Sequence, residues 1–368
     1  MNFSMRNDEK AVLKLRQLYE KYGYHQFKMS KFEEYDLYTR NKDFLVSDSI
    51  ITFNDTNGTL MALKPDVTLS IIKDSADVDG SVKKVYYNEN VYRVPKNAQD
   101  FKEIMQAGLE CIGEIDEYLI CETLYLAAQS LFEISEDFIL DISHMNLISA
   151  VLSELHLSSS GEKEVLKCIG EKNLSGIFRI CSAEGASEEK TNLMMTIASS
   201  YGSMGKVIRQ LKELNYDKIQ PYIRTLETIE AFFHGTNLSD RIHFDFSVIH
   251  DIHYYNGIVF KGFINHIPAG VLSGGQYDRL MEKMNRSSHA IGFAVYLDLL
   301  ERLGDEEQEY DVDAVVLYDD QCDINTIKTV VQSFTAQNRS VSVQKEIPKN
   351  LRYKTLYRLS EGGAEFRG

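Results

Sequence analysis

The stretch HDIHYYNGIVFKGFINHIPAGVLSGGQYD, residues 250–278, carries the densest chemical pattern of this 368-residue chain. It joins a Tyr-Tyr pair to one β-branched and aromatic run, and then to a second run that ends in Gly-Gly-Gln-Tyr-Asp. The two runs predict strands, because short apolar stretches bounded by Gly and Pro are typical of strands. The density of polar and aromatic groups predicts either a working active site or a retained binding pocket.

The composition is that of an ordinary globular protein, with 43% apolar residues, 26% charged residues and a net charge of −15. Nucleic acid is not an expected partner, since phosphate binding requires a concentrated Lys/Arg face. The five cysteines form no CxxC pair, which favours free thiols in a reducing cytosol. No signal-peptide pattern and no membrane-length apolar run occur, so we expect a cytoplasmic protein without membrane contact.

Outside the opening stretch, hydrophobic periodicity predicts both helices and strands. Residues 8–22 predict an amphipathic helix with Val12, Leu15, Leu18 and Tyr19 in its buried stripe. Further strands are expected at 50–53, 59–63, 101–114, 138–142 and 241–249, a hairpin at 83–94, and helices from Thr68 and at 116–133, 146–155 and 288–302.

The chain divides by composition. Residues 157–235 are rich in Ser, Lys and Glu with apolar positions at helical spacing, which predicts an insertion of several short helices. An acidic linker at 303–309 precedes a β-α-β pattern. We therefore expect an α+β core over 1–156 and 236–304, a helical insertion over 157–235, and a small α/β tail over 310–368.

Six blocks in this chain resemble those of histidyl-tRNA synthetase, a class II aminoacyl-tRNA synthetase, and they occur in the same order. LKPDVT at 63–68 resembles LRPEGT, Arg93 in NVYRVPK resembles the motif 2 arginine, MQAGLE at 105–110 matches Q-x-G-x-E, Tyr254-Tyr255 resembles the end of RGLDYY, GGQYD at 274–278 resembles GGRYD, and AIGFA at 290–294 resembles motif 3. The resemblance implies a class II synthetase-like core, an antiparallel sheet flanked by helices.

The resemblance also assigns histidine binding to a set of positions. These are Asp66, Thr68, Arg93, Gln106, Glu110, Tyr254, Tyr255 and Tyr277. The residue types agree with that ligand, because carboxylate and amide oxygens accept hydrogen bonds from an ammonium group. A tyrosine hydroxyl and a carboxylate can likewise pair with the two ring nitrogens of an imidazole.

The departures from the family concern the chemistry of adenylation. Arginines stabilise the charge that builds on the phosphoryl oxygens of ATP. Arg93 is kept, but the other two adenylation arginines align with His250 and Leu299. Gln276 also replaces the arginine of GGRYD, and Asp66 is one methylene shorter than the usual glutamate. Losing one such donor costs about 3–4 kcal/mol of transition-state stabilisation. We therefore predict a retained amino-acid site and a lost ATP site.

This asymmetry resembles the regulatory subunits of ATP phosphoribosyltransferase, the first enzyme of histidine biosynthesis. The resemblance implies a non-enzymatic subunit with no catalytic residue and no cofactor. It would bind L-histidine and a short-form catalytic subunit for activation and feedback control, as a homodimer within a hetero-oligomer. Histidine could bind in the synthetase-like pocket or at the subunit interface. A divergent histidyl-tRNA synthetase that activates histidine with ATP, or a stand-alone histidine- or RNA-binding module, remain alternatives.

Three histidines and two aspartates lie close together in the sequence, and such residues are possible metal ligands. They are His243, His250, His253, Asp245 and Asp251. Their spacing matches no standard ligand pattern, so no metal is expected.

Overall fold

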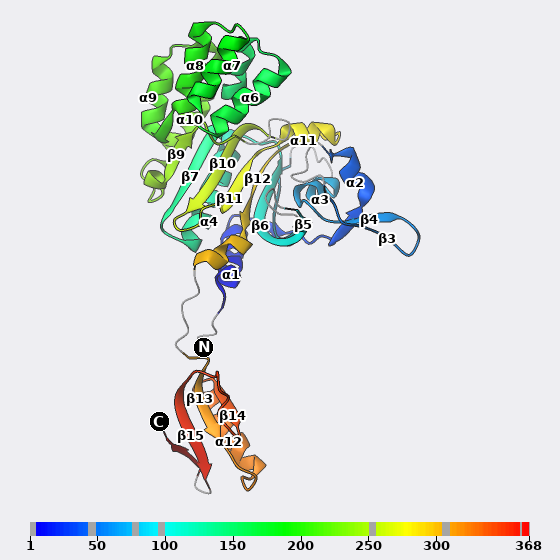
Figure 1. The fold of residues 1–368 in the computed structure, drawn as a ribbon, viewed down its shortest axis with the longest axis vertical. Helices are drawn as coiled ribbons and strands as arrows, with labels where there is room; N and C mark the ends of the chain where they lie inside the picture. Colours follow the sequence, from blue (N-terminus) through cyan, green and yellow to red (C-terminus); the bar gives the residue numbers. More distant parts are fainter. Residues whose placement is uncertain are drawn as a thin grey trace. The chain divides into compact units, whose positions relative to one another are not determined.

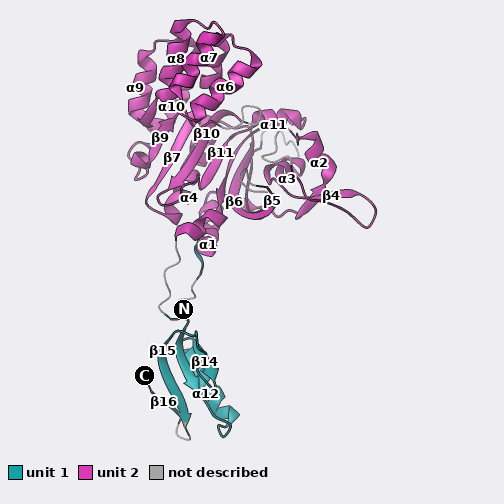
Figure 2. Ribbon diagram, in the orientation of Figure 1, with its two compact units in different colours: residues 1–7, 304–368 teal, residues 8–303 magenta. Residues whose placement is uncertain are grey.

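The computed structural model describes residues 5–42, 49–75, 81–94, 100–249, 255–303, 310–360 and 363–367. Backbone packing divides the chain into two compact units, one of residues 8–303 and one of residues 1–7 and 304–368 (Figure 2). The larger unit holds all of the residues proposed for ligand binding. Within the described residues, no helix is both long and apolar enough to cross a bilayer. All five cysteines have free thiols, as expected.

A nine-stranded sheet organises the described part of the larger unit, in the order β1-β5-β6-β12-β11-β10-β7-β9-β8 (Figure 1). In that order the strands are His25–Gln26, Lys83–Arg93, Lys102–Gly113, His289–Tyr296, Leu272–Gln276, Asn256–Ile264, Phe138–His144, Ile242–Asp245 and Tyr201–Ser203. The strands from β5 to β7 are antiparallel, as predicted. The sheet as a whole is mixed, because β1 runs parallel to β5 and β7 runs parallel to β9.

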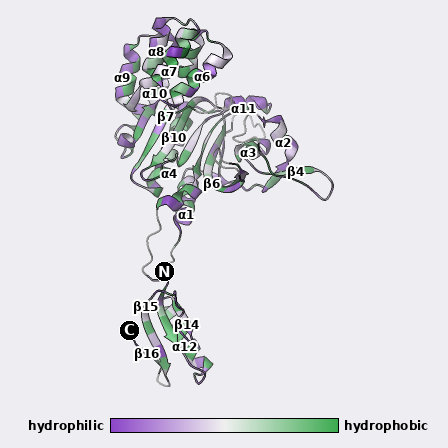
Figure 3. Ribbon diagram, in the orientation of Figure 1, coloured by the Kyte–Doolittle hydropathy of each residue, from purple (hydrophilic) through white to green (hydrophobic). Residues whose placement is uncertain are grey.

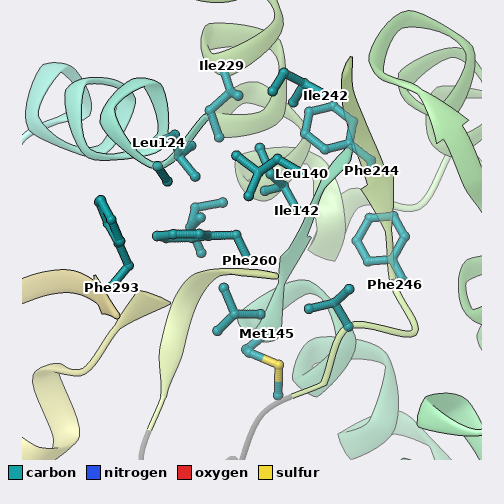
Figure 4. Close-up of a cluster of buried hydrophobic side chains, with 14 of the residues drawn as sticks. Leu124, Leu140, Ile142, Met145, Ile229, Ile242, Phe244, Phe246, Phe260 and Phe293 are labelled. Atoms are coloured by element: carbon teal, nitrogen blue, oxygen red, sulfur yellow. The ribbon is translucent and has the colours of Figure 1, made fainter. Parts of the chain in front are cut away.

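One face of the sheet carries the main hydrophobic core. Phe260 on β10 and Phe293 on β12 pack edge to face, with ring centroids 6.2 Å apart, and Leu124 of α4 belongs to the same cluster (Figure 4). The helices α1 (Asn7–Lys21) and α4 (Glu117–Ile134) contribute apolar stripes to this core. The predicted helix at 8–22 is confirmed, and Leu15 and Tyr19 are buried in its stripe.

The opposite face carries a second, smaller core. It includes residues of three short helices, α2 (Tyr35–Arg40), α3 (Thr68–Lys73) and α11 (Asp278–Lys283), packed with strand residues such as Tyr87. A three-stranded sheet of β2 (Phe32–Glu34), β4 (Leu60–Leu63) and β3 (Thr52–Asn54) contributes Ala62 to it. Because Glu110 lies on the same face of β6 as Ile112 of this cluster, the second core surrounds the predicted ligand site.

The segment between β7 and β9 is helical, as predicted. It contains α5 (Met145–Leu152), α6 (Ser159–Gly170), α7 (Leu174–Ala183), α8 (Glu188–Ser199), α9 (Met204–Glu213) and α10 (Gln220–Phe233), with the short strand β8 between α8 and α9. The side chains of Ser158, Asn173 and Ser187 cap three of these helices by accepting hydrogen bonds from backbone amides. Strands β7 and β10 are mostly hydrophobic, whereas these helices carry both hydrophobic and hydrophilic residues (Figure 3). The buried residues of these helices therefore continue the main core.

The smaller unit has its own sheet, in the order β14-β13-β15-β16. Its elements are β13 (Val312–Leu317), α12 (Ile324–Ala336), β14 (Val341–Gln344), β15 (Tyr353–Ser360) and β16 (Gly363–Phe366). The predicted β-α-β unit is confirmed, because β13 and β14 pair in parallel. Its core contains Ala314, Val316, Phe334 and Leu359.

Two local predictions were wrong, and a third was too long, because the strand expected at 241–249 ends at Asp245. Residues 83–94 form one strand rather than a hairpin, since β5 pairs with β6 along its whole length, from Lys83 to Arg93. Pairing with a long partner strand overrides the turn preference of Asn and Glu at 88–90. The expected helix at 288–302 is the strand β12 followed by the 3-10 helix η5 (Leu297–Leu303). Here β6 and β11 flank β12 on both sides, and strands buried on both faces lose the alternation that separates them from helices.

Candidate amino-acid-binding site

A buried carboxyl group stands at the centre of the candidate site. Glu110 lies on β6 and is 2% exposed. Its Oε1 accepts a hydrogen bond from the Thr68 hydroxyl at 2.9 Å, and its Oε2 accepts one from the Tyr277 hydroxyl at 2.5 Å. Thr68 is the first residue of α3, and Tyr277 directly follows β11. Three of the residues predicted from the sequence are therefore brought together by three different elements.

The carboxylate of Glu110 occupies space that only glycine leaves open. Gly292 on β12 is the register partner of Glu110, and a Cβ at Gly292 would lie 1.8 Å from Glu110 Oε2. The same Cβ would lie 2.5 Å from the carbonyl oxygen of Leu109. No larger residue fits there without displacing the carboxylate or the backbone.

Two tyrosines lie over glycines on the same face of the sheet. A Cβ at Gly108 would lie 2.6 Å from the Tyr87 hydroxyl, and a Cβ at Gly275 would lie 2.8 Å from Cδ1 of Tyr255. Both rings are therefore seated directly against the sheet. Burial raises the pKa of both tyrosines well above the ordinary value, so their hydroxyls keep their protons and remain hydrogen-bond donors.

The electrostatic state of Glu110 follows from its burial. Desolvation raises the pKa of Glu110 to about 8, although the hydrogen bonds from Tyr277 and Thr68 oppose that shift. The negative charge of Asp66 raises the pKa further. At neutral pH the carboxyl therefore holds a proton for most of the time. A cationic ligand nearby would favour the ionised form.

Asp66 has a structural role that the sequence did not predict. Its Oδ1 accepts a hydrogen bond from the Leu69 backbone amide at 2.9 Å, in the first turn of α3. Burial raises the pKa of the Asp66 carboxyl, and this hydrogen bond and the nearby Arg93 guanidinium both lower it. Asp66 therefore holds the helix that presents Thr68.

Arg93 and Gln106 are both buried on the strands that carry the site. Arg93, at the end of β5, is 9% exposed. Burial raises the pKa of the Asp298 carboxyl, and the positive charge of Arg93 opposes that rise. Gln106 is 6% exposed and lies on the same face of β6 as Glu110. Gln106 and Glu110 are four positions apart on β6, so their backbones are about 13 Å apart. These two residues thus border the site rather than contact Glu110.

The tyrosine pair is only partly described. Burial raises the pKa of Tyr255, and Tyr296, Glu110 and Asp66 raise it further. Because these groups act on its hydroxyl, the Tyr255 ring lies among the site residues. Tyr254 lies outside the described residues, as does His250.

Two positions that depart from the family pattern have structural environments of their own. Leu299 lies in η5 and packs against the main hydrophobic core. Gln276, at the end of β11, accepts a hydrogen bond from the Ile258 backbone amide at its Oε1, at 2.7 Å. Leu299 is thus partly buried in apolar surroundings, and Gln276 is hydrogen-bonded to the neighbouring strand.

Sequence reasoning missed a buried ion pair beside the site. Lys64 is fully buried, and its Nζ lies 2.8 Å from Oε2 of Glu89, which follows Tyr87 and Asn88 on β5. Burial lowers the pKa of Lys64, and Glu89 opposes that shift. The two residues are 25 positions apart and no local pattern links them. The sequence signal that could have located the floor of the site is Gly108 on β6, Gly275 on β11 and Gly292 on β12.

The His and Asp cluster noted in the sequence lies partly within the described residues. Within the described ranges, no three His, Cys, Asp or Glu residues are placed to hold a metal ion. His243 instead shares a hydrogen bond of 3.1 Å between its Nδ1 and the Tyr201 hydroxyl. His253 and Asp251 lie outside the described residues.

Comparison with known proteins identifies the same family along most of the chain. A family model described as histidyl-tRNA synthetase matches residues 4–300. An ATP phosphoribosyltransferase regulatory subunit from Caldanaerobacter subterraneus subsp. tengcongensis is 26% identical over 290 residues, which is 77% of this chain and 75% of that protein.

Two solved structures share the fold. One is described as an ATP phosphoribosyltransferase regulatory subunit/histidyl-tRNA synthetase from Bacillus halodurans, with a TM-score of 0.80, 21% identity, and 97% of this chain and 96% of that chain covered. The other belongs to an ATP phosphoribosyl transferase (HisG:HisZ) complex from Thermotoga maritima, with a TM-score of 0.62, 20% identity, and 79% and 97% covered. The core therefore has the class II fold of histidyl-tRNA synthetase, as predicted. Since the family model spans most of the residues, this chain belongs to the histidyl-tRNA synthetase family.

Proposed function

We propose that this chain is a non-catalytic regulatory subunit of ATP phosphoribosyltransferase in histidine biosynthesis. It would bind histidine and a short-form catalytic subunit in the cytoplasm, as a homodimer within a hetero-oligomer. The observation that carries the proposal is the buried Glu110 carboxyl held by Thr68 and Tyr277, in a chain that has the apolar Leu299 where synthetases have an adenylation arginine.

The chemistry of the site suits an amino acid with a ring that forms hydrogen bonds. Glu110 and Asp66 become anionic acceptors when an ammonium group or a protonated ring nitrogen lies beside them, because a nearby positive charge favours the ionised carboxylate. Buried tyrosine hydroxyls such as that of Tyr255 can pair with a second ring nitrogen. Histidine offers all of these groups in one small molecule. Arg93 is the positive group in this set that could pair with its carboxylate.

The surroundings of Arg93 support a non-catalytic role. Adenylation needs several positive donors around the phosphoryl group, because charge builds on its oxygens in the transition state. Leu299 supplies none, and the Asp298 carboxyl, whose pKa Arg93 lowers against the effect of burial, adds a negative group in the surroundings of Arg93.

The partner in this proposal comes from the relatives. A curated relative is named as a regulatory subunit of ATP phosphoribosyltransferase, and one structural neighbour belongs to a complex of that enzyme. A chain of this kind would activate the catalytic subunit and transmit feedback inhibition by histidine. Because the histidine site is buried in the second core, binding there would be coupled to the packing of α3 and α11.

The test is reconstitution with a short-form catalytic subunit. We expect the two chains to co-purify, phosphoribosyltransferase activity to require this chain, and histidine to inhibit the complex. A catalytic subunit that is fully active and histidine-sensitive alone would contradict the proposal. Variants of Glu110 then show whether inhibition operates through this site.

The second candidate is a divergent histidyl-tRNA synthetase, which the retained Arg93 and the matched family favour. A synthetase must catalyse histidine-dependent exchange between ATP and pyrophosphate. Exchange above background that is lost in Arg93→Ala would support this candidate. If the chain binds histidine but shows no exchange above background, this candidate is excluded.

A further inference from the structure

We propose that Gln276 is a positioning residue that holds Tyr255 over the candidate site by fixing a backbone bulge at the start of β10. Its expected effect on ligand affinity rests on the proposed function as a histidine-binding protein. The positioning itself is a property of the fold and can be tested without a ligand.

The bulge is visible in the strand register. Asn256 on β10 pairs with Gln276 on β11, whereas the next pair is Val259 with Gly275. Gly257 and Ile258 therefore lie between two successive pairs and have no register partner on β11. An unpaired backbone amide in a buried strand is costly. Oε1 of Gln276 accepts the Ile258 amide at 2.7 Å and so replaces the missing ladder bond.

The bulge and the side chain fit each other. Gly257 has φ of +66°, a conformation that glycine adopts readily and most other residues avoid. A Cβ at Gly257 would lie only 2.2 Å from Oε1 of Gln276. The oxygen thus occupies the space that a side chain would fill, and the glycine is required for two separate reasons.

A second contact holds the same two segments together. Asn256 donates from Nδ2 to Oδ2 of Asp278 at 2.7 Å, and its Oδ1 accepts the Asp278 backbone amide at 2.8 Å. Oδ1 of Asp278 also accepts the Ala290 backbone amide of β12 at 3.0 Å. The start of β10 is therefore attached to the end of β11 and to β12 by side chains on both sides of Tyr277.

These contacts begin at the residue that follows Tyr255. The Tyr255 ring lies against Gly275, the residue before Gln276, and Tyr277 follows Gln276 and donates to Glu110. Any shift of the bulge therefore moves Tyr255 relative to the buried carboxyl. An arginine at 276 carries only donors and cannot accept the Ile258 amide. Gln276→Arg is thus expected to disturb the site rather than restore an ATP-binding group.

The test compares two changes at one position. Gln276→Leu removes the acceptor at nearly constant size, and Gln276→Glu keeps an acceptor oxygen. We expect Gln276→Leu to weaken histidine binding about 3- to 10-fold by calorimetry, the effect of losing one hydrogen bond, and Gln276→Glu to rescue most of that loss. Gln332→Leu, the same change at an exposed position in α12, is the control for the chemistry of the substitution.

A double-mutant cycle separates positioning from general destabilisation. If Gln276 acts through Tyr255, Gln276→Leu should have little further effect on affinity in a Tyr255→Phe background. An equal fold-change in both backgrounds would overturn the proposal. If Gln276→Leu fails to fold, Gly257→Ala is the substitute, because its new methyl group displaces the same bulge. Gly257→Ala must then weaken histidine binding in wild type and have little further effect in a Tyr255→Phe background.

A ligand-free measurement distinguishes this inference from the proposed function. Amide hydrogen exchange by NMR should show faster exchange at Ile258 in Gln276→Leu than in wild type, together with shifted Tyr255 ring signals. If wild type binds no histidine but these changes occur, the proposed function fails and the positioning inference stands. Unchanged Ile258 exchange and Tyr255 signals would overturn the inference whether or not histidine binds.

Discussion

The Tyr277 hydroxyl donates a 2.5 Å hydrogen bond to the Glu110 carboxylate, although the two residues are 167 positions apart in the chain. The other carboxylate oxygen is bound by Thr68, 42 positions away in the opposite direction. One buried carboxyl therefore connects α3, β6 and the end of β11. Because Tyr277 and the residues around Thr68 also belong to the second core, changes at this site should affect both stability and ligand binding.

Glu110→Gln is expected to weaken histidine binding, since the amide cannot carry the negative charge that pairs with a cationic group of the ligand. The loss should be about 1–3 kcal/mol, the range for a hydrogen bond to a charged group. Titration calorimetry measures it directly. Glu164→Gln, at an exposed position of α6, is the matched control and should bind as wild type. Equal affinity in both variants would place the histidine site elsewhere, for example at the interface with the catalytic subunit.

The stability of the protein should depend on pH through Glu110. Its pKa in the folded chain is about 8, above the ordinary value of 4.5. Between these two values the folded state holds a proton that the unfolded state has released. This contribution is therefore complete below pH 4.5 and is lost as the pH rises towards 8.

Chemical denaturation at pH 5, 6.5 and 8 can isolate that contribution. Asp141, whose pKa is raised to about 7, titrates in the same range, so wild type alone cannot assign the effect. Because Glu110→Gln retains Asp141, the difference between the two proteins reports Glu110. We expect wild type to lose stability relative to Glu110→Gln as the pH increases, and a constant difference would contradict the assignment.

Gly292→Ala should abolish the geometry of the site while changing a single methyl group. The new Cβ would lie 1.8 Å from Glu110 Oε2 and 2.5 Å from the Leu109 carbonyl oxygen, so the carboxylate must move. We expect at least a tenfold loss of histidine affinity, about 1.4 kcal/mol or more. Gly170→Ala is the control, since its Cβ would meet only the Ser247 carbonyl oxygen at 4.0 Å. Histidine affinity equal to that of wild type in Gly292→Ala would show that Glu110 does not contact the ligand.

Phe260→Ala should test the main core. The ring is fully buried on β10 and packs against Phe293. Removing a buried phenylalanine ring typically costs about 3–5 kcal/mol, since the lost burial adds to the cost of the cavity. Denaturant unfolding should show that loss. Phe178→Ala on α7, where the ring is half exposed, should change the free energy of unfolding far less.

Much of the secondary structure was predictable because it depends on neighbouring residues. The stripe of Leu15 and Tyr19 at helical spacing predicts α1, and the alternation of Ile242 and Phe244 with polar residues predicts β9. The predictions failed where two partner strands decide the outcome. The segment containing Asn88 is an unbroken strand because β6 pairs with it throughout, and residues 289–296 are a strand between two others.

Motif resemblance grouped some residues that lie together in the structure, but it did not predict their roles. Motif resemblance grouped Thr68, Glu110 and Tyr277, and the structure brings these three side chains into direct contact. It did not indicate that Asp66 accepts the Leu69 amide in the first turn of α3 or that Gln276 accepts the Ile258 amide of β10. Those roles depend on backbone amides whose positions are set by strand register, which no spacing in the sequence encodes.

Local periodicity was enough to predict elements such as α1 and β9, and short motifs were enough to indicate the family. The burial of Glu110 against Gly292, the rise of its pKa to about 8 and the contact of Tyr255 with Gly275 could not be predicted in this way. The physical reason is one of range. Periodicity is a property of residues a few positions apart, whereas burial, desolvation and register depend on strands that the chain brings together from far apart.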